Sequence, residues 1–96
     1  MTVVFHPEAS QDVQEAFRWY ESRDSDVADA FRAALDRAVD RIRERPLGCP
    51  TYGHGLRRVL LKKFPFQVVF RPGETEVFVV AVAHFKRRPR FWLERL

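Results

Sequence analysis

The sequence has only one cysteine and no long apolar run, and both features narrow what the protein can be. Because Cys49 has no second cysteine to pair with, an internal disulfide is excluded. The longest apolar run, Val77–Ala83, has the length of a strand and falls short of the ~18–20 residues that a membrane span needs. The N-terminus lacks a basic region followed by a long apolar core, so we expect no signal peptide. Together these features predict a cytoplasmic protein without a membrane partner.

Motifs for catalysis and for ligand binding are also scarce. The histidines His6, His54 and His84 are scattered, and no His, Cys or carboxylate pair has the spacing of metal ligands. The Gly53-His54-Gly55 stretch leads into a predicted strand rather than a helix, so it is not a phosphate-binding loop. No Gly-x-Ser-x-Gly motif is present, and Cys49 has no adjacent basic residue that would activate it. We therefore expect no metal and no cofactor, and we interpret Cys49 as a loop or core residue.

Acidic residues are scarce in the C-terminal part of the chain. The 96 residues carry a net charge of +4, but the charge is distributed unevenly. Residues 1–55 contain seven arginines and ten acidic residues, whereas residues 56–96 contain ten basic and three acidic residues. The first part therefore has a net charge of −3 and the second of +7. A basic region of this kind indicates a surface that meets nucleic acid or an acidic protein segment.

The N-terminal half predicts one strand and two amphipathic helices. Thr2–Phe5 is short, β-branched and aromatic, as is typical of a strand. Pro7 suits the first turn of the following helix. The apolar stripe of that helix recurs at helical intervals in Val13, Ala16, Phe17 and Tyr20. Asp24-Ser25-Asp26 caps a second helix that should end at about Arg45, and the two helices form a hairpin that needs a sheet to pack against.

The C-terminal half predicts three strands, Leu56–Lys62, Phe66–Arg71 and Glu76–His84. Because the links between them are short, we expect an antiparallel meander. Glu76–His84 is apolar on both faces and should be the central strand. The sequence thus predicts a single α+β domain over residues 1–96, in the order β-α-α-β-β-β. Its helix hairpin should pack on one face of a four-stranded, mainly antiparallel sheet.

A basic and aromatic segment, residues 85–96, follows the last predicted strand. Four of its first six residues are cations, interleaved with aromatic residues that could stack on bases or dock a protein. We predict that the target-binding residues are Lys86, Arg87, Arg88, Arg90, Phe91 and Trp92. The simpler interpretation is a solvated basic tail.

His84 and the cations of the first meander strand each allow two interpretations. His84 ends a hydrophobic strand, so it is either a strand-end histidine bonded to a carbonyl or a general base. The Arg57-Arg58 and Lys62-Lys63 pairs either protect an edge strand from aggregation or bind a ligand. Because side chains alternate along a strand, one member of each pair should lie on the sheet face opposite the helices.

Several short motifs recur in one known group of proteins. No single motif is specific, but two of them are fairly specific in combination, the Lys63-Phe64-Pro65-Phe66 corner and the phrase Ala83-His84-x-x-Arg87-x-Pro89-x-Phe91-Trp92. The less specific pieces are Phe5-His6-Pro7-Glu8-Ala9, Trp19-Tyr20, Arg45-Pro46 and Gly55-Leu56-Arg57-Arg58. With the element order, these motifs resemble the RelE/ParE superfamily of bacterial toxin–antitoxin toxins over essentially the whole chain. The two more specific motifs indicate its ParE-like branch.

The resemblance implies a toxin that is neutralised by a cognate antitoxin with an acidic, amphipathic C-terminal segment. We expect that segment to cover exposed apolar residues on the sheet face opposite the helices. The residues we expect it to contact are Arg57, Lys63, Phe66 and Val68. ParE-like toxins block DNA gyrase by binding and have no known hydrolytic centre, so the resemblance makes gyrase the leading target.

The resemblance leaves an enzymatic alternative open. RelE-like toxins cleave mRNA in the ribosome with arginines, lysines and often a C-terminal tyrosine or histidine. If this chain were such a nuclease, His84 would be the base, and Arg87 with Arg57 or Arg58 would bind the phosphate. No tyrosine follows Tyr52, however, which favours gyrase as the target. A further alternative is a non-toxic basic module that binds nucleic acid.

Overall fold

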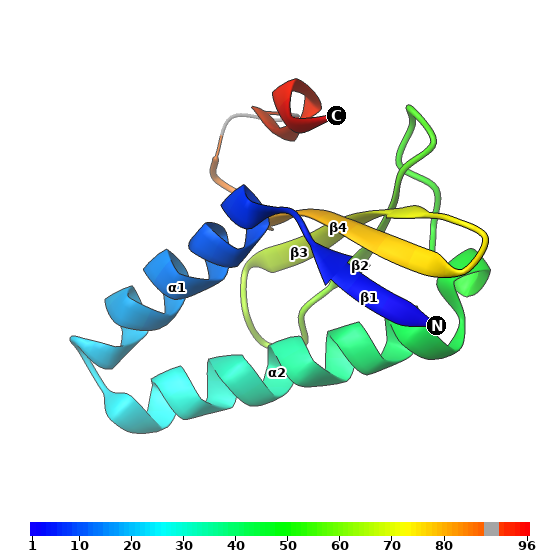
Figure 1. Cartoon of the computed structure of the whole chain (residues 1–96). Helices are drawn as coiled ribbons and strands as arrows, with labels where there is room; N and C mark the ends of the chain where they lie inside the picture. The colour runs from blue at the N-terminus through cyan, green and yellow to red at the C-terminus, as the bar shows by residue number, and fades with distance from the viewer. Residues whose placement is uncertain (88–90) are drawn as a thin grey trace.

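Two helices pack on one face of a four-stranded sheet in the computed structural model, which describes residues 1–87 and 91–96 (Figure 1). The predicted order β-α-α-β-β-β is confirmed. The N-terminal elements are β1 (Thr2–Phe5), α1 (Pro7–Glu21) and α2 (Ser25–Glu44), followed by a short 3-10 helix, η1 (Pro46–Gly48). The C-terminal elements are β2 (Arg57–Leu60), β3 (Phe66–Pro72), β4 (Glu76–His84) and a second 3-10 helix, η2 (Phe91–Arg95).

The strands are arranged in the order β1-β4-β3-β2, so β4 lies inside the sheet as predicted. β1 pairs with β4 in parallel, and the other two pairings are antiparallel. β2 is shorter than predicted, because its last pair is Leu60 with Gln67 and the chain then turns at Lys63, whose φ is 69°. The mainly antiparallel sheet of the sequence prediction is otherwise confirmed.

Local sequence signals account for the bounds of both helices. The Nδ1 atom of His6 accepts the N–H of Glu8 at 3.0 Å, and Pro7 occupies the first turn of α1. The carboxylate of Asp24 accepts the N–H of Asp26 at 2.9 Å and caps α2, as predicted. α2 ends before Pro46, which has no N–H to continue the helical hydrogen bonds.

A β-bulge in β4 changes which residues face the helices. β3 residues Val69 and Phe70 are opposite Ala81 and Val79, which leaves Val80 as the extra residue. Val79 therefore packs with the helices, while Val80 and Ala81 both belong to the core cluster on the opposite face. Before the bulge the odd-numbered residues Val77 and Val79 face the helices, whereas after it the even-numbered Val82 does.

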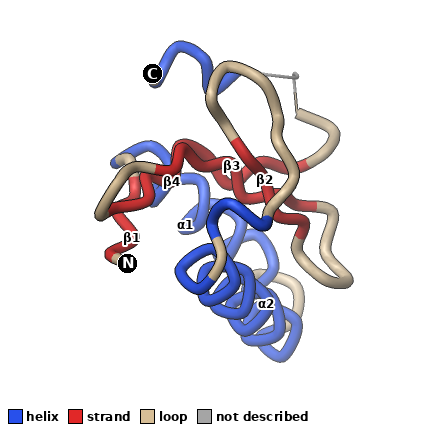
Figure 2. Tube along the Cα trace, turned by 90° about the vertical axis from the view of Figure 1, so that its right-hand side faces the viewer, coloured by secondary structure: helices blue, strands red, loops and turns tan. Residues whose placement is uncertain are grey.

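Apolar residues are buried on both faces of the sheet, so the molecule has three layers (Figure 2). The larger cluster lies between the helices and the sheet and includes Phe31, Ile42 and Val68. The second cluster lies on the other face, where Trp92 of η2 packs with Leu56, Val69, Val80, Ala81 and Ala83. The expectation of an exposed apolar face opposite the helices is therefore wrong. The chain covers much of that face with its own C-terminal segment, which we define as residues 91–96.

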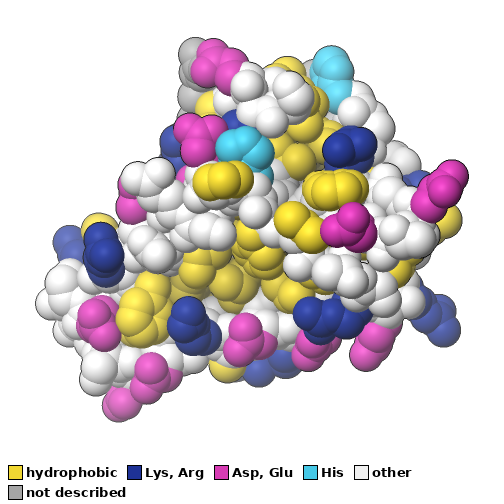
Figure 3. Space-filling model, viewed as in Figure 1, with side chains coloured by type: hydrophobic (Ala, Val, Ile, Leu, Met, Phe, Trp, Pro, Cys, Tyr) yellow, Lys and Arg dark blue, Asp and Glu magenta, His cyan; other side chains and the backbone are white. Residues whose placement is uncertain are grey.

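The outer surface of the helices is charged. Basic and acidic side chains alternate along the helical side of the molecule (Figure 3). One such pair, Arg43 and Asp40 on α2, is joined by a hydrogen-bonded ion pair of 2.8 Å. Within the described residues, no helix has the length and apolar character needed to cross a membrane.

Candidate functional site

A groove of about 540 Å³ opens between α1 and the ends of β3 and β4, and we call it the helix–strand groove. Its apolar and aromatic lining consists of Ala16, Trp19, Tyr20, Pro65, Phe66 and Val82. Its polar lining consists of Asp12, Glu15, His84 and Arg87. Trp19 is 53% exposed, which is unusual for so large an apolar ring. A groove with aromatic sides and a few polar groups is suited to bind an apolar side chain of a partner.

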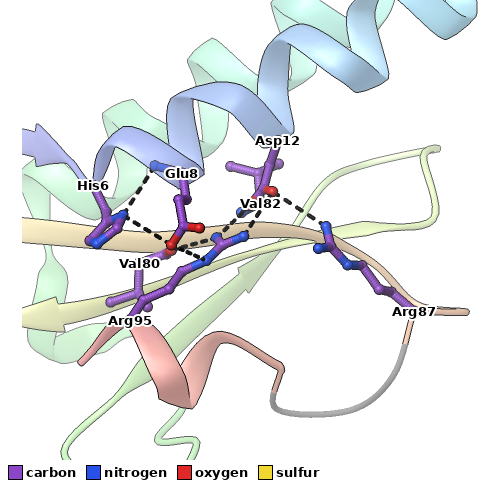
Figure 4. Close-up of polar contacts among 7 residues, drawn as sticks. All are labelled: His6, Glu8, Asp12, Val80, Val82, Arg87 and Arg95. Atoms are coloured by element: carbon purple, nitrogen blue, oxygen red, sulfur yellow. Dashed lines mark hydrogen bonds and ion pairs between the residues drawn. The ribbon is translucent and has the colours of Figure 1, made fainter.

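Asp12 lies on the face of α1 that is buried against the sheet. The buried residues of α1 are Ala9, Asp12 and Ala16, so the deepest face is rotated from the predicted stripe. The small alanine side chains let the helix approach β4 closely. One oxygen of the Asp12 carboxylate, Oδ2, accepts the N–H of Val82 at 3.1 Å (Figure 4). The N–H of Val82 lies beyond Val79, the last β4 residue that pairs with β1, and Asp12 supplies its acceptor.

Arg95 of η2 completes the environment of this carboxylate. Its guanidinium donates to Oδ2 of Asp12 at 2.8 Å and to Oδ1 at 3.1 Å (Figure 4). It also donates to the carbonyl of the bulge residue Val80 at 2.9 Å, and its Nε lies 3.5 Å from the Glu8 carboxylate. The side chains of Arg95 and Asp12 are only 8% and 5% exposed. The hydrogen bond to Asp12 raises the pKa of Arg95 above its ordinary value, although burial acts in the opposite direction.

The partners of Asp12 and Arg95 could not have been found from the sequence pattern. The two residues are 83 positions apart, and no local periodicity connects them. The available signal was the carboxylate of Asp12, which lies three residues after Ala9 and four residues before Ala16 on the same helix face. Such a carboxylate must find a partner if that face is buried.

Arg87 lies at the rim of the helix–strand groove. Its guanidinium donates to Oδ1 of Asp12 at 3.3 Å and lies 3.6 Å from the ring centroid of Phe91. Its side chain remains 47% exposed, so it can still contact a partner. Lys86 beside it is also exposed. Two residues of the predicted target-binding set therefore present cations to solvent next to an apolar groove.

The other members of the target-binding set are placed differently. Arg88 and Arg90 lie outside the described residues. Phe91 is half-buried, beneath the guanidinium groups of Arg87 and Arg95. Trp92 is 2% exposed and packs on the sheet, so the expectation of a surface-exposed ring at this position is corrected. The physical reason is that the second face of the sheet is apolar and needs a cover.

The predicted antitoxin-binding residues lie on the helix side of the sheet. Val68 and Phe66 are 0% and 8% exposed and belong to the cluster beneath the helices, which corrects their expected place on the open face. Phe66 nevertheless lines the helix–strand groove. Arg57 also faces the helix side, opposite Phe70, and donates to the Cys49 carbonyl at 2.6 Å. Lys63 is exposed in the turn before β3.

The residues proposed for an mRNA nuclease do not converge. His84 pairs with Phe66 at one end of β3, while Arg57 pairs with Phe70, four residues or ~13 Å further along the strand. Arg58 lies on the opposite face, over the Tyr52 ring and bonded to Gln67. Only His84 and Arg87 share the groove.

The hydrogen bonding of His84 also limits its use as a base. Its Nδ1 accepts the N–H of Lys86 at 3.0 Å, so in the neutral ring the proton is on Nε2. The alternative of a strand-end histidine with a backbone partner is therefore observed, although the backbone group is a donor. In the described part of the chain, no group of three or more His, Cys, Asp or Glu residues could hold a metal ion.

Comparisons with known proteins identify a similar fold and a family for this chain. A solved structure described as "Chromosomal ParDE TA system from P. aeruginosa" contains a chain with a similar fold, at a TM-score of 0.75 and 17% sequence identity. The match covers 88% of this chain and 95% of that chain. None of the curated proteins is similar enough to match. Residues 3–89 match the family model described as the ParE toxin of the type II toxin–antitoxin system, parDE. This chain therefore belongs to the ParE toxin family of type II toxin–antitoxin systems.

Proposed function

We propose that this ParE-family chain inhibits DNA gyrase by binding and that a cognate antitoxin neutralises it in the cytoplasm. The observation that carries the proposal is the position of Arg87, an exposed cation at the rim of an apolar groove. Lys86, the preceding residue, is also exposed, so two cations follow the end of β4 where aromatic side chains line the groove. Such a surface is suited to bind a macromolecule without catalysing a reaction on it.

The geometry gives less support to ribosome-dependent mRNA cleavage. A nuclease needs a base and phosphate-binding cations within reach of one phosphodiester. Here the two β2 arginines point to opposite faces of the sheet, and both Nδ1 of His84 and the guanidinium of Arg57 are engaged with backbone groups. We therefore propose that the residues after the C-terminal end of β4 recognise a target rather than catalyse a reaction.

For the antitoxin, we propose the helix–strand groove as the binding site. An amphipathic segment could insert an apolar side chain between Trp19 and Phe66 while a neighbouring carboxylate pairs with Arg87. The similar solved structure is that of a ParDE system, which supports the presence of a partner for the toxin. This site differs from the one expected from the sequence, the sheet face opposite the helices, because Trp92 packs on that face.

A supercoiling assay with purified protein tests the gyrase proposal. The wild-type protein should inhibit supercoiling or accumulate gyrase-cleaved DNA. Arg87→Ala should weaken inhibition by about tenfold, since it removes a charge at the proposed interface. Arg43→Ala is the matched control, because Arg43 is 46% exposed and also paired with an aspartate, but lies on α2. Normal supercoiling at saturating wild-type protein would contradict the proposal.

A further inference from the structure

Two arginine–aspartate pairs in the described residues have the same length and opposite surroundings. Arg95 and Asp12 are joined at 2.8 Å with both side chains less than a tenth exposed. Arg43 and Asp40 are joined at 2.8 Å with side chains 46% and 64% exposed. Exposed pairs contribute little to structure, whereas breaking a buried pair leaves a desolvated charge. The buried pair is therefore expected to control the position of the elements that it joins.

The elements joined are the first helix, the central strand and the C-terminal segment. Arg95 is the second-last residue, and its guanidinium reaches both the α1 carboxylate and the Val80 carbonyl of β4 (Figure 4). The most deeply buried apolar anchor of the segment is the Trp92 ring on the sheet, where Phe91 and Leu93 also pack. Its Nε1 atom is buried without a hydrogen-bond partner among the described residues, which opposes that packing. Arg95 thus supplies the polar attachment that Trp92 lacks.

The same carboxylate places Arg87. Oδ1 of Asp12 accepts from both Arg95 and Arg87, at 3.1 Å and 3.3 Å. Phe91 lies under both guanidinium groups, with distances to its ring centroid of 3.6 Å for Arg87 and 4.9 Å for Arg95. The rim cation of the groove is therefore held between a buried carboxylate and a ring of the C-terminal segment.

We propose that Asp12 and Arg95 are positioning residues of the binding surface, because their buried pair fixes the C-terminal segment and thereby the Arg87–Phe91 stack at the groove rim. The proposal rests on the proposed function, in that Arg87 is the residue that meets the partner. The side chains of Arg95 and Asp12 are 8% and 5% exposed, although Asp12 does line the groove. Their effect on binding is therefore expected to act mainly through Arg87 and Phe91.

Loss of the pair should release the segment without unfolding the sheet. Because η2 lies outside the hydrogen-bonded strands of the sheet, the uncompensated charge of Arg95 can return to water when residues 91–96 leave the sheet. The helices and strands keep their own hydrogen bonds and the cluster beneath the helices. Trp92 then becomes exposed to solvent, which makes it a reporter that does not depend on toxin activity.

The first experiment measures acrylamide quenching of Trp92 in a Trp19→Phe background, where Trp92 is the only tryptophan. Arg95→Gln and Asp12→Asn should raise the quenching constant several-fold and shift emission to the red, with unchanged far-ultraviolet circular dichroism. Arg95→Lys, which keeps the charge, should restore part of the protection. Asp40→Asn and Arg43→Gln are the matched controls and should leave quenching at the parent value. If Arg95→Gln is folded and its quenching also stays at that value, the proposal is overturned.

The second experiment compares supercoiling inhibition by the same variants with Trp19 intact. Arg95→Gln should weaken inhibition about as much as Arg87→Ala, and the double variant should be little weaker than either alone. Full inhibition by folded Arg95→Gln that exposes Trp92 would overturn the positioning role. If even the wild-type protein leaves supercoiling normal, the proposed function fails. The quenching experiment then still decides by itself whether the buried pair holds the C-terminal segment, so the two failures can be distinguished.

Discussion

At the scale of single residues, the structure assigns Cys49 to the core. It is 2% exposed and belongs to the cluster beneath the helices, as one of the two roles predicted for it. Its Sγ lies 3.6 Å from the Arg45 carbonyl, which accepts a weak S–H hydrogen bond. Burial raises the pKa of the Cys49 thiol, although the nearby Arg41 and Arg57 charges oppose the effect. The thiolate is therefore scarcer at a given pH than in an unfolded chain.

Two consequences of the Cys49 environment can be measured. A thiol-reactive disulfide reagent should label native protein much more slowly than guanidinium-unfolded protein, with one equivalent reacting in total. Because the folded-state pKa is raised, the stabilising contribution of the neutral thiol is complete below its unfolded pKa and is lost as pH rises above it. Cys49→Ala should therefore lose less stability than wild type between neutral and alkaline pH. Equal labelling of native and unfolded protein would contradict the assignment.

Sequence reasoning was limited at this scale by long-range partners. It identified Arg87 as a candidate because of the cationic cluster, and the structure places Arg87 at the groove rim. It missed Asp12 and Arg95, because the partners of a buried charge depend on which surfaces meet. It also placed Trp92 on the surface, since composition alone cannot distinguish an aromatic residue that contacts a partner from one that packs on the protein's own sheet.

At the scale of elements, local signals were sufficient for the helices and for the bounds of β4, but not for the bulge within β4. The caps and Pro46, the first residue of η1, set the helix bounds, and these signals act within a few residues. The bulge at Val80 has no such signal, because valine suits either face of a buried strand. The bulge nevertheless decides that Val82, rather than Ala83, faces the helices.

The β3–β4 turn provides an element-scale prediction. A Cβ atom on Gly73 would lie 2.8 Å from the Glu76 carbonyl oxygen and 3.3 Å from the Phe78 ring. Gly73→Ala should therefore lower the free energy of unfolding by about 1–3 kcal/mol, because the backbone must shift. Gly48→Ala is the control, since its Cβ would meet Arg45 side-chain atoms no closer than 3.4 Å. Urea denaturation measures both, and an unaffected Gly73→Ala midpoint would contradict the close packing of this turn.

At the scale of the whole molecule, the two faces of the sheet have different covers. The helix hairpin covers one face over a continuous core, while the C-terminal segment covers the other through Trp92 and the buried Arg95 pair. The helix–strand groove lies at the helix side of β4, next to both covers. A partner in this groove contacts the N-terminal helix and the end of the last strand at once.

Binding of the cognate antitoxin should therefore stabilise the whole fold. A ligand that binds only the folded state at a free concentration of about 100 times Kd raises the free energy of unfolding by ~2.7 kcal/mol. We expect the melting temperature to rise with antitoxin concentration in a thermal scan. Trp19→Ala should reduce this shift, while Leu47→Ala, an exposed apolar site on η1 outside the groove, should not. A tightly bound antitoxin that produced no shift would contradict this coupling.

Local patterns along the chain were enough to predict the order of the elements, the central place of β4 and the concentration of positive charge in the last 41 residues. These features depend on periodicity, capping and composition, which act locally along the chain. The tertiary structure alone decided that residues 91–96 cover the second face and that Asp12 and Arg95 meet. Those contacts join residues far apart in sequence, and their energy comes from burial, which exists only once the sheet, α1 and the C-terminal segment have packed together.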